Sequence, residues 1–285
     1  MPIDYNTLMN WRIPDAQQDY TAKDCMLYAL GIGFGAAPLD DRHLTHVYEQ
    51  ELTAFPSMAM VIATGGPWAR APGTGIDYAK VVHAEQAFVL HRPLPVGGSA
   101  HSRSRVVEII DKGAGRGAIV TMERDLFVDN DDAPVATLRS SLFCRGDGGC
   151  GGPSTPARKP DTMPDRAPDH VHSLPVAPHQ ALIYRLSGDY NEIHVAPAAA
   201  ERAGFKAPIL HGLCSFAMAL RSVADSLNLA APQITGASVR FTAIVYPGET
   251  LETSVWREGD TARFRTRVVE RNVVALDFGS VRLGG

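Results

Sequence analysis

The sequence predicts an α+β protein made of two similar modules, each an antiparallel sheet wrapped around a central helix. Two observations lead to this prediction: the same order of strands occurs twice along the chain, and a long amphipathic helix precedes the second set. The chain has 285 residues, enough for two domains that each bury a core of their own. Hydrophobic residues make up 45% and charged residues 20%, which is typical of a globular protein.

The repeated order of strands is visible in apolar runs separated by turn-forming residues. In the first half, a strand ends at the Pro/Gly turn 92–98, and further strands are expected at 104–109, 117–127 and 134–144. In the second half, a strand ends at the turn 244–250, and further strands are expected at 251–256, 261–271 and 273–283. The alternation of Ala262, Phe264, Thr266 and Val268 has the period of a sheet with one buried face. A duplicated module is the simplest explanation of this repeat.

The central helix is predicted only in the second half. Apolar residues there follow spacings of 3, 4, 3 and 4, at Leu213, Phe216, Leu220, Val223 and Leu227. This spacing places them on one face of a helix, which we expect to be core. The matching segment of the first half, 56–75, contains three prolines and four glycines, so a long helix is not expected there. We therefore predict that the N-terminal helix is reduced.

The stretch 145–178 marks the boundary between the modules. Its density of proline and glycine is incompatible with a helix or a central strand, so we interpret it as an extended linker. The predicted organisation is an N-terminal module at 1–145, a linker at 146–178 and a C-terminal module at 179–285.

Charge and hydropathy exclude several classes of protein. The net charge of −4 argues against a nucleic-acid-binding protein, which would present a basic surface to phosphates. No apolar run is long enough to cross a bilayer, and the polar start lacks the pattern of a secretory signal, so we expect a protein of the cytoplasm without membrane contact. The four cysteines include no C-x-x-C pair, so we expect them to be reduced and predict no metal site.

Residues that could carry acid–base chemistry cluster in the segment 184–216. Asp189, Asn191 and His194 lie within six residues, and a turn between them would let the carboxylate and the imidazole share one water molecule. Asn191 either helps to orient that water or only shapes the turn. Downstream, Gly212 opens the predicted helix, where unpaired N–H groups and the helix dipole can stabilise a negative oxygen. His211 either contributes to the pocket or caps the helix.

The same segment resembles the hydratase 2 motif of the MaoC-like family, which includes (R)-specific enoyl-CoA hydratases. The matching positions are 184–189, Asn191, His194, Pro197, 203–205 and 208–214. The N-terminal half resembles the non-catalytic half of the two-module members at Asp24, 27–33, 83–86 and 92–95. This resemblance implies a double hotdog, in which two sheet-around-helix modules lie side by side. The chain departs from the family pattern at Glu192-Ile193, where Pro-Leu is usual, and at Ala196, where Asp is frequent.

The resemblance implies that Asp189 and His194 hold the catalytic water, that Asn191 orients it, and that the Gly212 N–H binds the thioester oxygen. We further predict that His211, Leu213, Tyr190 and Phe205 contact the substrate. The implied reaction interconverts trans-2-enoyl-CoA and (R)-3-hydroxyacyl-CoA, with space for a medium, long or bulky acyl chain where the N-terminal helix is reduced. The CoA thioester is the substrate, and no metal or other cofactor is expected. A homodimer is plausible because module edges in this fold often pair.

Three other functions remain open from the sequence. Hotdog modules also form acyl-CoA thioesterases, which typically use an acidic residue on the central helix, and here that helix offers only Asp225 near its end. A non-catalytic acyl-CoA-binding partner is the second. The third keeps the hydratase reaction but acts on a steroid side-chain or branched dicarboxylyl-CoA. His83, Glu85 and Gln86, in the half without Asp189 and His194, are interpreted as structural or module-contact residues.

Overall fold

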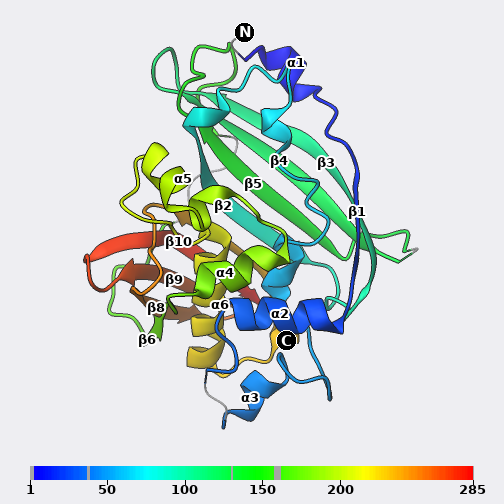
Figure 1. Cartoon of the computed structure of the whole chain (residues 1–285), viewed down its shortest axis with the longest axis vertical. Coiled ribbons are helices and arrows are strands. Elements are labelled where there is room, and N and C mark those ends of the chain that lie inside the picture. Colours follow the sequence, from blue (N-terminus) through cyan, green and yellow to red (C-terminus); the bar gives the residue numbers. More distant parts are fainter. Residues whose placement is uncertain (1–2, 37–38, 130, 157–161, 285) are drawn as a thin grey trace.

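The computed structural model describes residues 3–36, 39–129, 131–156 and 162–284. Its main feature is one antiparallel sheet of ten strands in the order β1-β3-β4-β5-β2-β7-β10-β9-β8-β6 (Figure 1). The strands are β1 (Ala16–Tyr20), β2 (Val81–Leu90), β3 (Gly98–Asp111), β4 (Ala118–Val128), β5 (Ala136–Cys144), β6 (His170–Pro175), β7 (Ile234–Phe241), β8 (Thr250–Glu258), β9 (Thr261–Val268) and β10 (Val273–Leu283).

The sheet consists of two halves with the same internal order. Reading outward from the middle, the first half runs β2-β5-β4-β3-β1 and the second runs β7-β10-β9-β8-β6. The halves join through antiparallel pairing of β2 with β7, from Glu85 opposite Arg240 to Val89 opposite Gly236. The duplicated module and the α+β class expected from the sequence are therefore confirmed.

The helices are not confined to one half of the sheet: the first contacts β3 of the N-terminal half, and the longest packs against β6 and β8 of the C-terminal half (Figure 1). The helices are α1 (Tyr5–Met9), α2 (Ala22–Gly31), α3 (Asp41–Leu44), α4 (Gln180–Tyr184), α5 (Pro197–Arg202) and α6 (Gly212–Leu227), with six 3-10 turns. The turns are η1 (Pro56–Met60), η2 (Trp68–Arg70), η3 (Tyr78–Lys80), η4 (Arg185–Ser187), η5 (Glu192–His194) and η6 (Ala231–Gln233).

Helix α6 is the central helix of the C-terminal module. It has 16 residues, and every residue from Cys214 to Ala224 is buried. Its neighbours are β6, β8, β9 and β10, so the C-terminal half of the sheet wraps around it. Phe216, Leu220 and Val223 of the predicted apolar stripe are fully buried, and Leu213 and Leu227 pack at its ends. The helix also contacts η1, and the Cys214 thiol donates to the Gly31 carbonyl of α2 at 3.4 Å.

The corresponding position of the N-terminal module holds only the five-residue turn η1. All five of its residues are buried, and η1 contacts both α6 and the middle of the sheet. The prediction of a reduced N-terminal helix is therefore confirmed. Pro56 at the first position allows one turn to start, and the glycines and prolines at 65–75 disfavour a long helix through the whole segment.

The sequence missed the two edge strands, β1 and β6. β1 pairs with β3 and β6 pairs with β8, so they occupy equivalent ends of the two halves. β6 lies inside the interval 146–178 that the sequence analysis assigned to a linker, and that assignment is wrong for this stretch. Proline density excluded a central strand, but an edge strand between Pro168 and Pro175 donates to one neighbour only and tolerates proline at its end.

Two further expectations concern bonding and membranes. All four cysteines are free thiols, three of them buried, as expected. Among the residues that the structure describes, no helix has the length and hydropathy needed to span a bilayer.

Candidate active site

Asp189 and His194 are brought to one place by two short turns. η4 ends at Gly188, whose φ of +118° reverses the chain in a conformation that side chains rarely adopt. η5 follows, with Asn191 as its first cap: its side-chain oxygen accepts the N–H of Ile193 at 3.4 Å. The Asn191 N–H donates to the Asp189 carboxylate at 3.2 Å. Asn191 thus shapes the turn and also orients the carboxylate.

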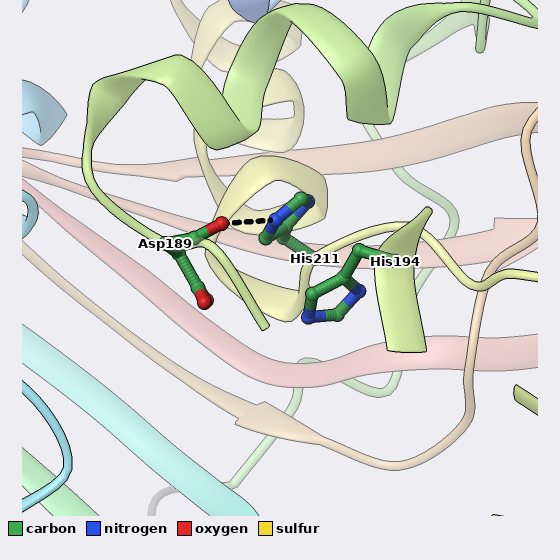
Figure 2. A group of neighbouring side chains, drawn as sticks. All are labelled: Asp189, His194 and His211. Atoms are coloured by element: carbon green, nitrogen blue, oxygen red, sulfur yellow. Dashed lines mark hydrogen bonds between the residues drawn. The ribbon is translucent and has the colours of Figure 1, made fainter. Parts of the chain in front are cut away.

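His211 completes a compact group with these two residues. Figure 2 shows Asp189, His194 and His211 facing one another, from the turn region and from the start of α6. One carboxylate oxygen and one ring nitrogen of each histidine all lie within 4.8 Å of one another. The two imidazole rings stack with centroids 3.7 Å apart. Both histidines are buried, with exposures of 7% for His194 and 1% for His211.

Backbone carbonyls fix the protonation pattern of both rings. His194 Nδ1 lies 2.9 Å from the Ile209 carbonyl and His211 Nε2 lies 3.2 Å from the Asp189 carbonyl. A carbonyl only accepts, so each of these nitrogens carries the proton. In the neutral ring, His194 Nε2 and His211 Nδ1 therefore keep free lone pairs. Buried His211 Nδ1 has no hydrogen-bond partner among the described residues, so it is available to a water or substrate hydrogen.

Burial keeps both imidazoles neutral near physiological pH. It lowers the pKa of His194, although the Ile209 carbonyl and the Asp189 carboxylate act in the opposite direction. The pKa of His211 falls to about 4, first because of burial and then because of the neighbouring His194. The group at neutral pH is thus a carboxylate beside two uncharged bases, a combination suited to accepting and returning a proton.

Gly212 follows directly after His211 and begins α6. The N-cap residue His211 makes no side-chain hydrogen bond to the helix, so its side chain leaves the first N–H groups of α6 without a capping acceptor. A Cβ on Gly212 would lie 3.3 Å from Cε1 of Phe241. Glycine therefore allows a ring to pack closely against the start of the helix, where the dipole favours a negative oxygen.

His83 of the N-terminal module lies behind this part of the site. Its ring packs on Phe241 with centroids 4.7 Å apart, and its Nε2 lies 3.0 Å from Ser140 Oγ. Burial lowers the pKa of His83 to about 4, with Asp189 close enough to act in the opposite direction. The interpretation of His83 as a module-contact residue agrees with this position. The sequence pattern gave no reason to place His83 near Asp189. The two residues come close because the pairing of β2 with β7 brings the two modules together.

A cavity of about 520 Å³ is lined by Gly188 and Tyr190, the chain neighbours of Asp189, but not by Asp189, His194 or His211 themselves. Its lining comes from both modules, with Gly188 and Tyr190 on one side. Another part of the lining is Met58, Val61 and residues 63–65, from the segment where the N-terminal helix is reduced. Gln18 of β1 and Leu27 of α2 close the remaining sides. The β1 residues were not identified from the sequence, because an edge strand of five residues carries too short a pattern.

The predicted substrate-contact residues separate into two groups. His211 belongs to the cluster with Asp189, and Tyr190 lines the cavity with its ring exposed. Leu213 packs at the edge of the core, and Phe205 is half-buried after α5, where its N–H donates to Ala200. Tyr190 is the one of the four that lines the cavity, and contact of all four residues with substrate stays a prediction.

Asp189, His194 and His211 are also the one group of metal-ligand type found in the described part of the chain. Each histidine already commits one nitrogen to a carbonyl, and the remaining nitrogens and the carboxylate could ligate an ion or act as bases. The donor set does not decide between these roles, and the absence of a metal requirement stays a prediction.

Fold and site together define a double hotdog protein with acid–base residues at the N-terminus of its one long central helix. Residues 159–277 match the MaoC like domain, and residues 18–146 match the MFE-2 hydratase 2 N-terminal domain. Enoyl-CoA hydratase ChsH3 of Mycobacterium tuberculosis is 37% identical over 264 residues, 91% of this chain and 91% of that relative.

Solved structures agree with these matches. A MaoC-like dehydratase from Phytophthora capsici superposes with a TM-score of 0.87 at 30% identity, covering 99% of this chain and 98% of that one. A Mycobacterium tuberculosis protein described as a double hotdog superposes with a TM-score of 0.57 at 15% identity, covering 95% and 94%, which shows the fold alone. The chain belongs to the MaoC-like hydratase 2 family, and the resemblance seen in the sequence is confirmed.

Proposed function

We propose that this protein is an (R)-specific hydratase that interconverts trans-2-enoyl-CoA and (R)-3-hydroxyacyl-CoA. The observation that carries the proposal is the convergence of the Asp189 carboxylate and two neutral imidazoles beside the N-terminus of α6. The relative from Mycobacterium tuberculosis, 37% identical, is named as an enoyl-CoA hydratase, which supports the same activity.

In the proposed reaction, Asp189 and His194 hold one water molecule. His194 Nε2 is the ring nitrogen without a proton, because Nδ1 donates to Ile209. The pair takes a proton from water as its oxygen bonds to Cβ, and returns a proton to Cα of the former double bond. Interacting groups of this kind share the role of base as a unit. The N–H of Gly212, at the positive end of the helix dipole, stabilises the enolate-like thioester oxygen between these steps.

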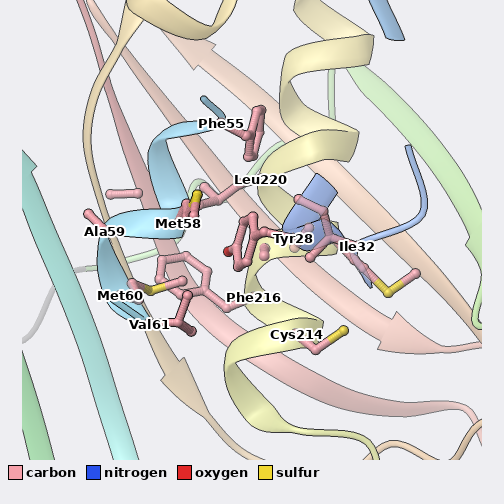
Figure 3. Packing of buried hydrophobic residues seen from close by; sticks show 14 of the residues in the cluster. Tyr28, Ile32, Phe55, Met58, Ala59, Met60, Val61, Cys214, Phe216 and Leu220 are labelled. Atoms are coloured by element: carbon pink, nitrogen blue, oxygen red, sulfur yellow. The ribbon is translucent and has the colours of Figure 1, made fainter. Parts of the chain in front are cut away.

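The cavity lined by Gly188 and Tyr190 is the proposed place for the acyl group. Its wall at 58–65 exists because η1 replaces a full helix, and Figure 3 shows η1 with Met58, Met60 and Val61 beside Phe216 and Leu220 of α6. We expect acyl chains of medium or greater length, or bulky ones, to be accepted. The lining contains polar as well as apolar groups, so the acyl identity, including steroid side-chain or branched dicarboxylyl groups, is left to the substrate series below.

Thioester hydrolysis is disfavoured by the surroundings of Asp225. Its carboxylate lies 3.0 Å from His43 Nε2 and 3.5 Å from Arg221 Nε. It also lies near the end of α6, roughly 20 Å along the helix from Gly212. An acidic residue held in ion pairs at the far end of the helix is poorly placed to attack a thioester next to Asp189.

The deciding experiment follows the absorbance of the enoyl-thioester double bond with C4, C8, C12 and C16 trans-2-enoyl-CoAs, with chiral chromatography of the product and a free-thiol assay. The proposal expects loss of absorbance, an (R)-3-hydroxy product and no thiol. Thiol release would identify a thioesterase. Binding of every acyl-CoA without reaction would identify a non-catalytic partner.

Three minor expectations belong to the same proposal. Activity after dialysis against a chelator should equal that before it, since the thioester itself activates the double bond. The protein should act in the cytoplasm, which fractionation of its source cells would check. A homodimer is expected, with light scattering as the measurement.

A further inference from the structure

Arg124 of β4 is a buried cation without an anionic partner among the described residues. Its side chain lies in the interior of the N-terminal module with an exposure of 3%. Burial lowers its pKa to about 10, so it stays charged at neutral pH. A buried charge without a counter-ion is costly, and a leucine or methionine would fill the same space. The position therefore needs the guanidinium for its hydrogen bonds.

All the hydrogen bonds found for the Arg124 side chain go to one stretch of backbone, residues 59–63. Nη2 donates to the carbonyls of Ala59 and Met60, at 3.1 and 3.0 Å. Nη1 donates to the carbonyl of Ala63 at 3.2 Å and to that of Ile62. These carbonyls belong to the end of η1 and the residues that follow it. In a longer helix they would accept N–H groups from the next turn, so the guanidinium takes the place of that turn.

Two other side chains hold the same stretch. Ser102 Oγ of β3 donates to the Ala63 carbonyl at 2.6 Å, and the Gln18 side-chain oxygen of β1 accepts the Ala63 N–H at 2.8 Å. Ala63 itself has φ of +48°, a strained conformation for alanine that its partners must enforce. Three neighbouring strands thus fix the backbone that forms one wall of the cavity, where Met58, Val61 and Ala63 face the space.

We propose that Arg124 is the positioning residue that ends the reduced helix at η1, keeps the cavity wall in place, and thereby sets which acyl chains the enzyme accepts. Arg124 lies behind the wall and acts through the backbone of 59–63, so its effect grows with the part of the acyl group that reaches this wall. The proposal rests on the hydratase function proposed above, and its test separates the two.

The test compares Arg124→Lys with Arg139→Lys. Lysine keeps the charge, but its single ammonium replaces the two separated nitrogens of the guanidinium and cannot reach all four carbonyls. Arg139 of β5 serves as the matched control because its side chain is 60% exposed and pairs with Glu123 on the outer face. We expect Arg124→Lys to lower the ratio of kcat/KM for C12 over C4 enoyl-CoA about tenfold, the effect of losing burial of two methylene groups. Arg139→Lys should leave that ratio unchanged.

Equal losses for C4 and C12 would overturn the proposal, because they would show a purely structural residue. If Arg124→Lys does not fold, Ser102→Ala removes one bond to the same wall and should lower the ratio in the same direction by roughly two- to fivefold. An unchanged ratio in Ser102→Ala would then reject the proposal.

A binding measurement keeps this test independent of the hydratase reaction. The rise in Tm produced by saturated dodecanoyl-CoA is compared with that produced by butyryl-CoA. If no enoyl-CoA is hydrated but the wild-type protein prefers the long chain and Arg124→Lys does not, the proposed function fails and the role of Arg124 stands. If both proteins show the same preference, the role of Arg124 fails.

Discussion

The two ends of α6 each hold an aspartate and a histidine, and they differ in how the charges are balanced. At the N-terminal end, the Asp189 carboxylate accepts one hydrogen bond from the described residues, donated by the backbone N–H of Asn191. Its neighbours are two uncharged imidazoles (Figure 2). No ion pair to this carboxylate is found in the described part of the chain. The positive end of the helix dipole supplies part of its stabilisation.

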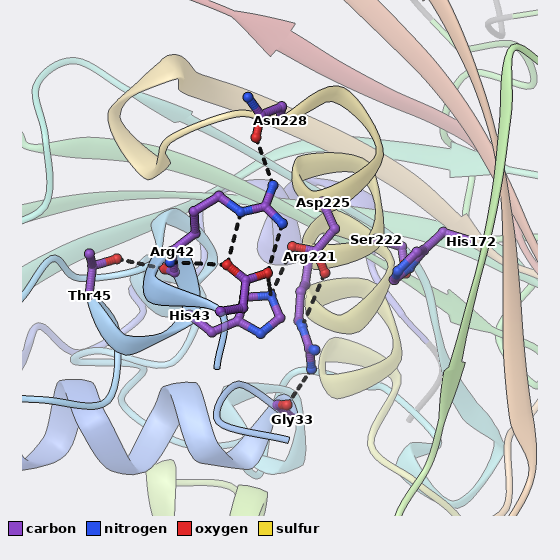
Figure 4. Close-up of polar contacts among 10 residues, drawn as sticks. Gly33, Arg42, His43, Thr45, His172, Arg221, Ser222, Asp225 and Asn228 are labelled. Carbon is purple, nitrogen blue, oxygen red and sulfur yellow. Dashed lines mark hydrogen bonds and ion pairs between the residues drawn. The ribbon is translucent and has the colours of Figure 1, made fainter. Parts of the chain in front are cut away.

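At the C-terminal end, Asp225 is surrounded by cations and donors (Figure 4). His43 Nε2 lies 3.0 Å from one of its oxygens, and Arg221 lies near the other. The Arg221 guanidinium also donates to the Gly33 carbonyl and sits over the ring of Phe34. In the neighbouring pair, Asp40 accepts from Arg42. The charges of the two aspartates and the two arginines balance, and the cluster attaches Gly33 and α3 to the helix.

The comparison teaches which cluster is built for stability and which for chemistry. Asp225 and Arg221 are largely buried and already engaged with each other, with His43 and with Gly33, so removing one partner would leave the others without it. A carboxylate beside two neutral bases with free lone pairs can still accept hydrogen bonds or a proton, which is the usual condition of a catalytic site. Variants at the two ends should therefore separate activity from stability.

The largest effect is expected from Asp189→Asn and His194→Gln. Each removes a proton acceptor while keeping the shape of the side chain, so kcat should fall by about 10²–10⁴. The Tm should stay close to that of the wild-type protein, because neither side chain belongs to an ion pair in the described structure. Enoyl-CoA kinetics and thermal melts of the same samples measure both. Near-normal turnover in either variant would remove that residue from the proposed site.

A smaller loss is expected when the helix N-terminus loses its first donor. Gly212→Pro removes the N–H at a position where helices tolerate proline, and kcat should fall by about 10²–10³. Gly212→Ala is the matched control, since it keeps the N–H and adds a Cβ that lies 3.3 Å from Phe241 Cε1. Equal kinetics for the two variants would show that crowding by Phe241, and not the lost donor, explains the effect.

The opposite result is expected at the other end of the helix. Asp225→Asn leaves Arg221 and His43 without their carboxylate, so the free energy of unfolding should fall by roughly 3 kcal/mol, as for a broken buried pair. Its kcat should remain within about threefold of the wild-type value, since no step uses Asp225. Urea unfolding and steady-state kinetics test this. Loss of kcat without loss of stability would reopen the thioesterase assignment.

Much of the fold was predictable because its signals are local. The stripe from Leu213 to Leu227 specified α6, and the prolines and glycines of 56–75 excluded its counterpart. The edge strands β1 and β6 were missed since each pairs on one side only and carries a weak pattern. The single ten-stranded sheet could not be predicted either, because the β2–β7 pairing joins residues about 150 positions apart along the chain.

The site was predictable where its residues are close in sequence. Asp189, Asn191 and His194 converge through turns that Gly188 permits. What the sequence could not supply is long-range: the stacking of His211 on His194, the carbonyl of Ile209 that fixes a tautomer, and His83 behind Phe241. Arg124 had no sequence signal at all, since an arginine on a strand is usually solvated, and its burial follows only from the backbone it supports.

The smallest effect concerns pH and again distinguishes the helix ends. Burial lowers the pKa of His211 from 6.5 to about 4, so between these values the unfolded chain binds a proton that the folded chain does not. Stability must then fall as the pH falls below 6.5, by up to about 1.4 kcal/mol per pH unit for that proton. His211→Asn should reduce this slope, by the contribution of that one proton, in urea titrations at pH 7, 6 and 5. The acid limb of kcat/KM should likewise lie below pH 6.5, because burial lowers the pKa of His194. An acid limb above that value would mean that the base is charged in the folded enzyme, and the neutral pair proposed for the N-terminal end would be wrong.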